Sequence, residues 1–459
     1  MYKIDFKHPC HMHFIGIGGI SMSGLAEILL SAGYTVTGSD SKESDLTMHL
    51  TGLGATVAYP QKAENITEDI DCIVFTAAIR EDNPEYVAAL SSGKPMLSRA
   101  NLLGQIMANY ENSIAVSGTH GKTTTTSMIS QILLETDKEP TISVGGILEA
   151  IHSNIHVGDS DLFITEACEY TNSFHQFYPK YNIILNVEAD HLDFFKDLED
   201  IRHSFKVFAN NTSANGILII NKDIPDIDYF TKDLSCQVIT YSINDTSADI
   251  TAVDLSYENG CASFVPVYKG QAYDAVTLSV PGEHNVSNAL SAICLCLEMG
   301  VSYKDILTGL KKFGGADRRF QYKGNYNGVT VIDDYAHHPT EISASLAAAK
   351  NYNYNRLVVC FQPHTYTRTL SFLDDFATAL SAADVVVLPD IYPARELDIY
   401  GVSSKDIAIR LEKLGCEVHY LGSFSACEKF LSENLLNSDL LITMGAGDVN
   451  LVGEHLLSK

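Results

Sequence analysis

Short apolar runs alternate along the chain with segments whose apolar residues recur at helical spacing. Near the beginning, runs at 11–16, 34–38 and 71–76 predict buried strands. Between the first two, Met22, Leu25, Ala26 and Leu29 share one helical face and predict a helix over 21–32. This alternation of strand and helix is typical of an α/β sheet with crossover helices.

The same alternation continues through the rest of the chain and divides it into three parts. Strand patterns in the middle part lie at 113–116, 161–165, 181–187, 216–220, 237–241 and 276–280. Those in the last part lie at 329–332, 357–361, 385–388, 418–421 and 440–444. We therefore predict three α/β domains, at 1–110, 111–314 and 315–459, with an interdomain hinge over 311–320 around Gly314-Gly315.

Composition supports this organisation and narrows the possible partners. A length of 459 residues suits about three domains. The net charge of −26 argues against a nucleic-acid or anionic-membrane partner, because such partners require a basic surface. The 10 cysteines contain no CxxC pair, and no apolar run is long enough to span a membrane. We expect a cytoplasmic protein with reduced thiols.

The strand at 113–116 leads into the most informative motif of the chain. A glycine-rich turn between a strand and a helix directs backbone N–H groups and the positive helix end at one point, where they bind phosphate. The turn predicts nucleoside triphosphate binding by Gly118, Thr119, His120, Gly121, Lys122, Thr123 and Thr124. Lys122 can reach the β- and γ-phosphates, and the Thr123 hydroxyl can ligate Mg²⁺. Val116 stands where a standard Walker A motif has glycine, and an accidental Gly-Lys-Thr is the alternative.

A second glycine turn follows the first predicted strand. Gly16, Gly18 and Gly19 resemble the start of a dinucleotide-binding fingerprint, with Asp40 further along the chain, but Ser21 occupies its last glycine position. The pattern predicts a helix end that holds a diphosphate and an acid that contacts a nucleoside. A tight turn with packing glycines is the alternative.

Acidic residues follow two strands of the middle part. Glu166 ends one strand, and the segment from Glu188 through Asp190 and His191 to Asp193 follows the next. Ligands of α/β sheets bind at the carboxyl ends of strands, and acids beside a triphosphate are suited to Mg²⁺. A solvated loop acid and a structural histidine are the alternatives for Glu166 and His191.

Polar residues also mark one helix start, the expected hinge and the ends of three strands in the last part. His284 and Asn285 begin a helix and could contact a base or simply cap the helix, and Arg318-Arg319 could clamp phosphate. The strand-end clusters lie at 333–341, 362–368 and 445–448.

Together these motifs resemble the Mur ligase family, and most closely its alanine-adding branch, over essentially the whole chain. The resemblance is carried by residues 13–24, 118–124, 188–193, 318–320 and 333–341. It implies an N-terminal Rossmann-like domain for the UDP end of the substrate and a central ATPase domain. A C-terminal Rossmann-like domain would close over ATP and bind the amino acid.

The resemblance also implies roles for residues around ATP. Lys122 matches the phosphate lysine, Thr123 and Glu166 match Mg²⁺ ligands, and His191 matches a ligand of a second Mg²⁺. Lys122, Glu166 and His191 are accordingly expected to be catalytic.

Further matches lie on the adenine, nucleotide and substrate sides. His284 and Asn285 fall where the family contacts adenine, and Arg319 and Asp334, also expected to be catalytic, fall where the closing domain meets the nucleotide. The substrate side is matched by Gly18, Gly19, Ser39 and Asp40 for the UDP-sugar and by Tyr335 and His337 for the amino acid.

The implied reaction uses ATP to convert the lactyl carboxylate of UDP-N-acetylmuramate into an acyl phosphate, which the amine of L-alanine then attacks. A histidine of the His337-His338 pair is a candidate acceptor of the amine proton. Alternatives are a ligase that attaches a recycled peptide, a nicotinamide-dependent dehydrogenase and a P-loop switch protein. We expect small-molecule partners only, and a monomer or weak homodimer.

Overall fold

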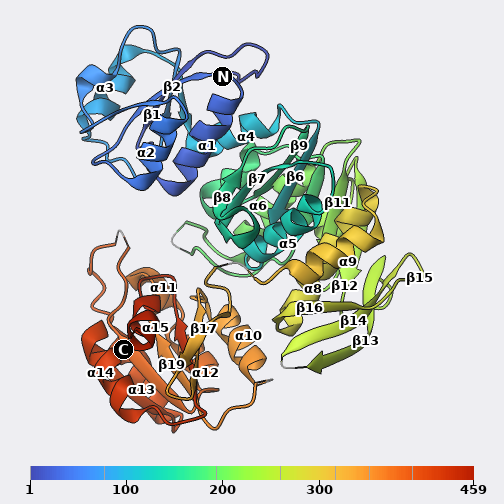
Figure 1. Ribbon diagram of the computed structural model, residues 1–459, viewed down its shortest axis with the longest axis vertical. Helices are drawn as coiled ribbons and strands as arrows, with labels where there is room; N and C mark the ends of the chain where they lie inside the picture. Colours follow the sequence, from blue (N-terminus) through green and yellow to red (C-terminus); the bar gives the residue numbers. More distant parts are fainter. Residues whose placement is uncertain are drawn as a thin grey trace. The chain divides into compact units, whose positions relative to one another are not determined.

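The computed structural model describes residues 2–76, 78–192, 194–258, 260–315, 317–350, 352–394 and 396–458. By its internal contacts the chain forms two compact units. Figure 1 labels helices and strands along the chain. The first unit comprises Met1–Gly118, Leu133–Asn186 and Arg202–Ile239, and the second comprises Thr119–Ile132, Val187–Ile201 and Thr240–Lys459.

The amino-terminal part of the first unit is a parallel sheet with strand order β3-β2-β1-β4-β5. The strands are β1 (His11–Ile15), β2 (Thr35–Ser39), β3 (Thr56–Ala58), β4 (Cys72–Phe75) and β5 (Met96–Ser98). The helices are α1 (Ile20–Ser31), α2 (Asp45–Gly52), the 3-10 helix η1 (Ala63–Asn65), α3 (Pro84–Ser92) and α4 (Arg99–Met107). The strand order reverses beside β1, and a ligand of such a sheet binds at this reversal, beyond the strand ends. The predicted glycine turn after β1 lies at that point.

A second sheet of the first unit has the order β11-β10-β6-β9-β7-β8, with β8 antiparallel to β7 and the other pairs parallel. Its strands are β6 (Asn112–Ser117), β7 (Thr141–Leu148), β8 (Ser153–His156), β9 (Leu162–Glu166), β10 (Tyr181–Ile184) and β11 (Ile217–Asn221). The 3-10 helices η2 (Glu149–Ile151) and η3 (Tyr170–Gln176) and the helix α7 (Asp228–Thr231) accompany them. Three elements have residues in both units: α5 (Lys122–Leu134), α6 (Leu198–Asn210) and β12 (Gln237–Ser242).

The second unit begins with a small, mostly antiparallel group of strands and two helices. These elements are β13 (Ile250–Glu258), β14 (Cys261–Tyr268), β15 (Gln271–Ala272), β16 (Val276–Pro281), α8 (Glu283–Glu298) and α9 (Tyr303–Lys312). Helix α9 ends at Lys312, so the expected hinge over 311–320 overlaps the last turn of a helix.

The carboxyl-terminal sheet has the order β17-β18-β22-β19-β20-β21, with only the edge strand β17 antiparallel. Its strands are β17 (Gln321–Tyr326), β18 (Val329–Asp334), β19 (Leu357–Phe361), β20 (Val385–Pro389), β21 (Glu417–Gly422) and β22 (Leu440–Met444). The helices are α10 (Pro339–Ala349), α11 (Tyr366–Ser371), α12 (Leu373–Leu380), α13 (Ser404–Lys413), α14 (Phe424–Asn434) and α15 (Asn450–Leu457).

Alternate residues of these strands bury against different helices. Val359 and Phe361 belong to the core that α10, α12 and α13 cover, whereas Val358 and Cys360 belong to the core that α14 and α15 cover. Because successive side chains of a strand point to opposite faces, a run that is apolar at every position requires cover on both faces. The three-domain α/β fold class is confirmed, whereas the boundaries at 110 and 314 remain a prediction.

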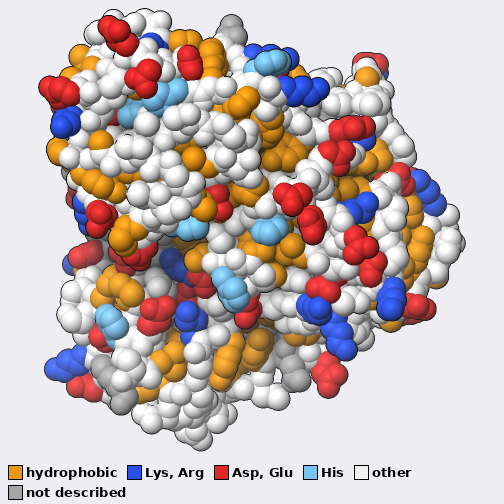
Figure 2. Space-filling view, turned by 45° about the horizontal axis from the view of Figure 1, so that its top comes forward, with side chains coloured by type: hydrophobic (Ala, Val, Ile, Leu, Met, Phe, Trp, Pro, Cys, Tyr) orange, Lys and Arg blue, Asp and Glu red, His pale blue; other side chains and the backbone are white. Residues whose placement is uncertain are grey.

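The surface charge and the hydropathy of the helices agree with the expectations from composition. On the face shown in Figure 2, Lys and Arg side chains lie singly or in small groups among Asp and Glu side chains. Among the described residues, no helix is long and apolar enough to cross a membrane.

Candidate functional site

The predicted phosphate-binding loop connects β6 to α5. Gly118 has a φ of 147° and Gly121 a φ of 84°, which are conformations that L side chains rarely adopt, so these two positions favour glycine. Helix α5 begins at Lys122, and its N-terminal end therefore points its partial positive charge into the loop. The Lys122 ammonium donates a hydrogen bond to the carbonyl oxygen of Thr119 over 3.1 Å.

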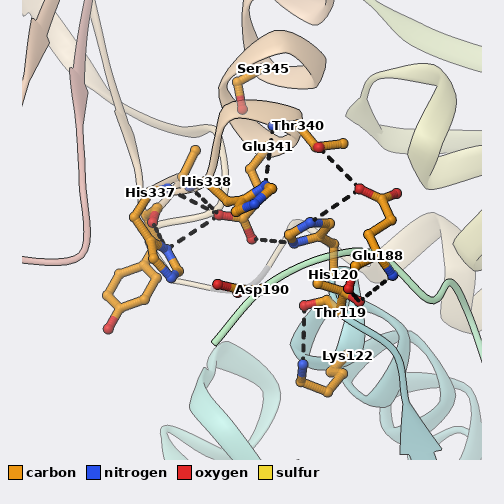
Figure 3. A network of polar contacts seen from close by, with 12 residues as sticks. Thr119, His120, Lys122, Glu188, Asp190, His337, His338, Thr340, Glu341 and Ser345 are labelled. Atoms are coloured by element: carbon orange, nitrogen blue, oxygen red, sulfur yellow. Dashed lines mark hydrogen bonds and ion pairs between the residues drawn. The ribbon is translucent and has the colours of Figure 1, made fainter. Parts of the chain in front are cut away.

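The loop is fastened to the segment that follows β10. The N–H of Glu188 donates to the Thr119 hydroxyl over 2.9 Å. The Glu188 carboxylate in turn accepts a hydrogen bond from the Thr340 hydroxyl over 3.0 Å. Figure 3 shows Glu188 between the loop and the start of α10.

His120 lies between two carboxylates. Its Nδ1 is 3.2 Å from Glu341 Oε1, and its Nε2 is 3.7 Å from Glu188 Oε2 (Figure 3). Burial alone would lower the pKa of His120, but the two carboxylates outweigh burial and raise it to about 9. His120 is therefore an imidazolium at neutral pH, and its proximity in turn lowers the pKa of Glu188.

Glu341 is the acceptor for several site residues. Its Oε2 accepts the N–H groups of His337 over 3.0 Å and His338 over 3.3 Å, so it completes the capping box that begins α10. Its Oε1 faces His120 and also lies 3.9 Å from the Arg319 guanidinium. Burial opposes ionisation, yet the neighbouring His337, His120 and Arg319 hold the pKa of Glu341 well below its usual value.

Asp334 and Arg319 lie close to Glu341. Asp334 ends β18, is buried, and accepts hydrogen bonds from the Ala336 N–H over 3.1 Å and from the Ser345 hydroxyl. Burial raises the pKa of Asp334 to about 6. The Arg319 guanidinium lies 5.1 Å from the centre of the Tyr335 ring, a cation–π contact. The loop residue His120 and the predicted residues Arg319 and His337 thus meet around Glu341.

Arg368 and His364, to which the sequence pattern assigned no individual role, also belong to this group of residues. The Arg368 guanidinium lies 3.2 Å from both Asp190 Oδ1 and His364 Nδ1. Burial alone would raise the pKa of Asp190, but Arg368 holds it below its usual range. The His364 ring packs against His337 at 5.9 Å between ring centres. The polar cluster at 362–368 was the available signal, but it did not identify these two residues.

Of the two residues expected at the adenine, Asn285 has structural partners of its own. The Asn285 side chain donates to the carbonyl of Pro281 over 2.7 Å and accepts from Asn288 over 3.1 Å, so it serves the start of α8. The preceding residue, His284, is exposed. Their contact with a base remains a prediction.

In the first unit, the amino-terminal glycine turn is bound to the acid expected to contact a nucleoside. The Asp40 carboxylate accepts the N–H of Gly18 over 2.8 Å and that of Ser41 over 2.7 Å. A Cβ added at Gly18 would lie 2.8 Å from Asp40 Oδ2, so glycine permits this approach. The carbonyl of Ser39 accepts the N–H of Ile17 over 3.0 Å. Gly19 precedes α1, whose N-terminal end is suited to phosphate.

Glu166, also in the first unit, ends β9 as predicted. Its carboxylate accepts the N–H of Gly145, where an added Cβ would lie 2.9 Å from both carboxylate oxygens. In the second unit, His191 has a φ of 52° and its N–H donates to Asp190 Oδ1 over 2.7 Å. Asp193 lies outside the described residues.

Thr123 and Glu166 supply the hydroxyl and carboxylate oxygens that Mg²⁺ prefers, whereas the imidazole of His191 is a less usual ligand for that ion. Among the described residues, no group of three or more His, Cys, Asp or Glu side chains is arranged to hold a metal. Thr123 and Glu166 are predicted for one Mg²⁺ and His191 for a second, so each ion would take at most two of these side chains and would need phosphate and water oxygens as well. Mg²⁺ commonly binds in that way, through one or two carboxylates and the phosphates of a nucleotide.

Comparison with known protein families gives three consecutive matches. Residues 11–111 match the Mur ligase family catalytic domain, residues 116–296 the Mur ligase middle domain, and residues 318–447 the Mur ligase glutamate ligase domain.

Individual proteins resemble the chain over its whole length. A UDP-N-acetylmuramate–L-alanine ligase of Agathobacter rectalis is 62% identical, with 100% of both chains covered, and one of Lachnospira eligens is 56% identical at the same coverage. The crystal structure of UDP-N-acetylmuramate-alanine ligase from Thermotoga maritima has 30% identity and a TM-score of 0.79, with 98% of both chains covered. A murein peptide ligase from Psychrobacter arcticus has 25% identity and a TM-score of 0.72 at the same coverage.

Proposed function

The chain belongs to the Mur ligase family, and we propose that it joins L-alanine to the lactyl carboxylate of UDP-N-acetylmuramate at the expense of ATP. The product, UDP-N-acetylmuramoyl-L-alanine, is a peptidoglycan precursor. The observation that carries this proposal is the full-length identity of 62% to a ligase of that name. The site geometry supports it, because Lys122, Arg319 and His337 lie in one unit around a phosphate-binding loop.

The first chemical step is transfer of the γ-phosphoryl group to the carboxylate. An ionised carboxylate oxygen already is a nucleophile, so this step needs orientation and neutralisation of charge rather than a protein nucleophile. Lys122 at the start of α5 and Arg319 are the cations that we assign to the phosphates. Asp334, which is buried near Arg319, orients the nucleotide in the same proposal.

Mg²⁺ would supply further charge neutralisation when bound. We assign Thr123 and Glu166 to one Mg²⁺, since hydroxyl and carboxylate oxygens suit that ion beside phosphates, and His191 to a second.

The second step is attack by the alanine amine, which must first lose a proton. The Nδ1 of His337 lies 3.0 Å from the carbonyl oxygen of Tyr335, so Nδ1 carries the hydrogen and Nε2 carries the lone pair. His338 has the opposite tautomer. Its Nδ1 accepts the N–H of Thr340 over 3.3 Å, so Nε2 carries the hydrogen. Of the two histidines, His337 is therefore our candidate acceptor, at Nε2.

The substrate-binding residues complete the proposal. We assign Gly18, Gly19, Ser39 and Asp40 to the UDP-sugar, through the helix end and turn after β1. Tyr335 and His337 are assigned to the amino acid. Arg368 and His364, beside His337, add a cationic group suited to an amino-acid carboxylate. The adenine is assigned to His284 and Asn285.

We also propose that the protein works in the cytoplasm as a monomer or weak homodimer with small-molecule partners only. The ten cysteines are free thiols, the state that a reducing compartment maintains. Light scattering across a concentration series measures the association state.

The experiment that tests the activity is ADP release with UDP-N-acetylmuramate and each candidate acceptor in turn. We expect release to depend on L-alanine and to be much weaker with the tripeptide that a peptide-adding ligase would use. Release that depends on the tripeptide and not on L-alanine would favour that second activity, which the murein peptide ligase structure represents.

A further inference from the structure

Glu341 is the residue at which three parts of the site meet, in addition to its place in the capping box of α10. Its two carboxylate oxygens face different partners (Figure 3). Oε2 accepts the N–H groups of His337 and His338, whereas Oε1 faces His120 of the phosphate-binding loop and Arg319. The side chain is only 14% exposed, so these contacts take place largely away from solvent.

We propose that Glu341 is a positioning residue of the ligase reaction, which holds the phosphate-binding loop and Arg319 in the geometry that the nucleotide requires. This inference rests on the proposed function. The nucleotide phosphates meet Lys122, two residues after His120, and Arg319 in that proposal. A carboxylate that fixes both His120 and Arg319 therefore fixes the spacing between the two phosphate-binding cations.

The charge arrangement explains why a carboxylate is needed at position 341. His120 lies between Glu341 and Glu188, and its raised pKa keeps it cationic, so each carboxylate has a cation to face. Loss of the charge at 341 would leave His120 held from one side only. It would also remove the ion pair between Arg319 and Glu341.

Helix capping is a separate role of Glu341, and it can be separated by substitution. Glutamine also serves in a capping box, because its amide oxygen can accept the N–H groups at the helix start. Its NH₂ group would then replace Oε1 and present a donor to His120 and Arg319. Glu341→Gln therefore keeps the start of α10 and removes the contact with the loop.

The chain offers a matched control. Asp406 occupies the same place in the capping box of α13, where it accepts the N–H of Ser403 over 2.8 Å. Asp406→Asn makes the same chemical change at a helix start that contributes no residue to the site.

The experiment measures kcat, KM for ATP and the affinity for a non-hydrolysable ATP analogue in Glu341→Gln, His120→Gln, the double variant and Asp406→Asn. Mutation of the residues that orient metal ligands typically costs about 10–100-fold in activity, and by analogy we expect losses in that range for both single variants. We expect weaker analogue binding in both, and a melting temperature close to that of the wild type. The double variant should lose less than the product of the two single losses, because both single variants remove the His120–Glu341 contact. Asp406→Asn should match the wild type.

Three results would overturn the positioning role. These are kcat and analogue affinity within twofold of wild type in Glu341→Gln, losses that multiply in the double variant, or an equal loss in Asp406→Asn. The proposed function fails separately, if the wild type shows no L-alanine-dependent ADP release. In that case analogue affinity alone still decides the role of Glu341.

Discussion

The Nδ1–H of His337 donates to the main-chain carbonyl of Tyr335 over 3.0 Å, which directs the ring's lone pair to Nε2. Burial lowers the pKa of His337 to about 4, so the ring is neutral at pH 7. The contact with the Tyr335 carbonyl therefore selects the tautomer of His337, and burial keeps its Nε2 without a proton.

This neutral state predicts a pH dependence of stability. Between pH 6.5 and 4 the unfolded chain binds a proton at residue 337 that the folded chain does not, so acidification through this range destabilises the fold. From pH 7 to pH 5 the contribution is about 2 kcal/mol at most. Urea unfolding of wild type and His337→Asn at both pH values measures it. We expect the variant to lose less free energy of unfolding on acidification, and an equal loss in both proteins would contradict a neutral His337.

Replacement of Lys122 tests the assignment of the phosphate-binding loop. Lys122→Met removes the ammonium at the start of α5, and by analogy with loss of one preorganised electrostatic donor we expect kcat to fall by about 10²–10³. ADP release by the folded variant measures this effect. Turnover close to that of wild type would exclude a phosphate-binding role for Lys122.

Asp334 is expected to affect the nucleotide and not the UDP-sugar. Asp334→Ala leaves the buried N–H of Ala336 and the hydroxyl of Ser345 without their acceptor, at a cost of about 1–3 kcal/mol each. Titration calorimetry should show weaker binding of an ATP analogue and UDP-N-acetylmuramate binding within twofold of wild type.

Ser345→Ala is the matched control for Asp334, because it removes one hydrogen-bond partner and keeps the carboxylate. Its effect on analogue binding should be smaller than that of Asp334→Ala. If Ser345→Ala is as damaging, the hydrogen bond between Ser345 of α10 and Asp334, rather than a contact of the carboxylate with the nucleotide, is responsible.

The amino-terminal glycine turn should distinguish UDP from nicotinamide nucleotides. A ligand raises the melting temperature of the state that it binds, so UDP should stabilise the protein and NADH should not. In Gly18→Ala the added Cβ would meet Asp40 Oδ2 at 2.8 Å, and the stabilisation by UDP should decrease. Stabilisation by NADH alone would refute the assignment of this turn to the UDP-sugar.

Features set by neighbouring residues were predictable from the sequence. The order of strand, glycine turn and helix around Lys122 is local, and it predicted the loop before any fold was known. The apolar runs at 357–361 and 440–444 predicted strands because continuous apolar residues require a sheet covered on both faces. The strand β17 escaped prediction, since Gln321–Tyr326 is polar and only partly buried and pairs as an edge strand.

The tertiary structure alone decided which residues of these local motifs meet. His120 and Glu341 are 221 positions apart, and Arg368 and Asp190 are 178 apart, so no local pattern pairs them. Strand-end motifs were expected near one another, but which carboxylate faces which cation depends on sheet order and helix placement. Those same surroundings bury the groups, and burial together with the nearest charges set the pKa values of His120, Asp334 and His337. The sequence determined which chemical groups are available, and the fold determined their partners and charges, because electrostatic interactions depend on distance in space rather than on separation along the chain.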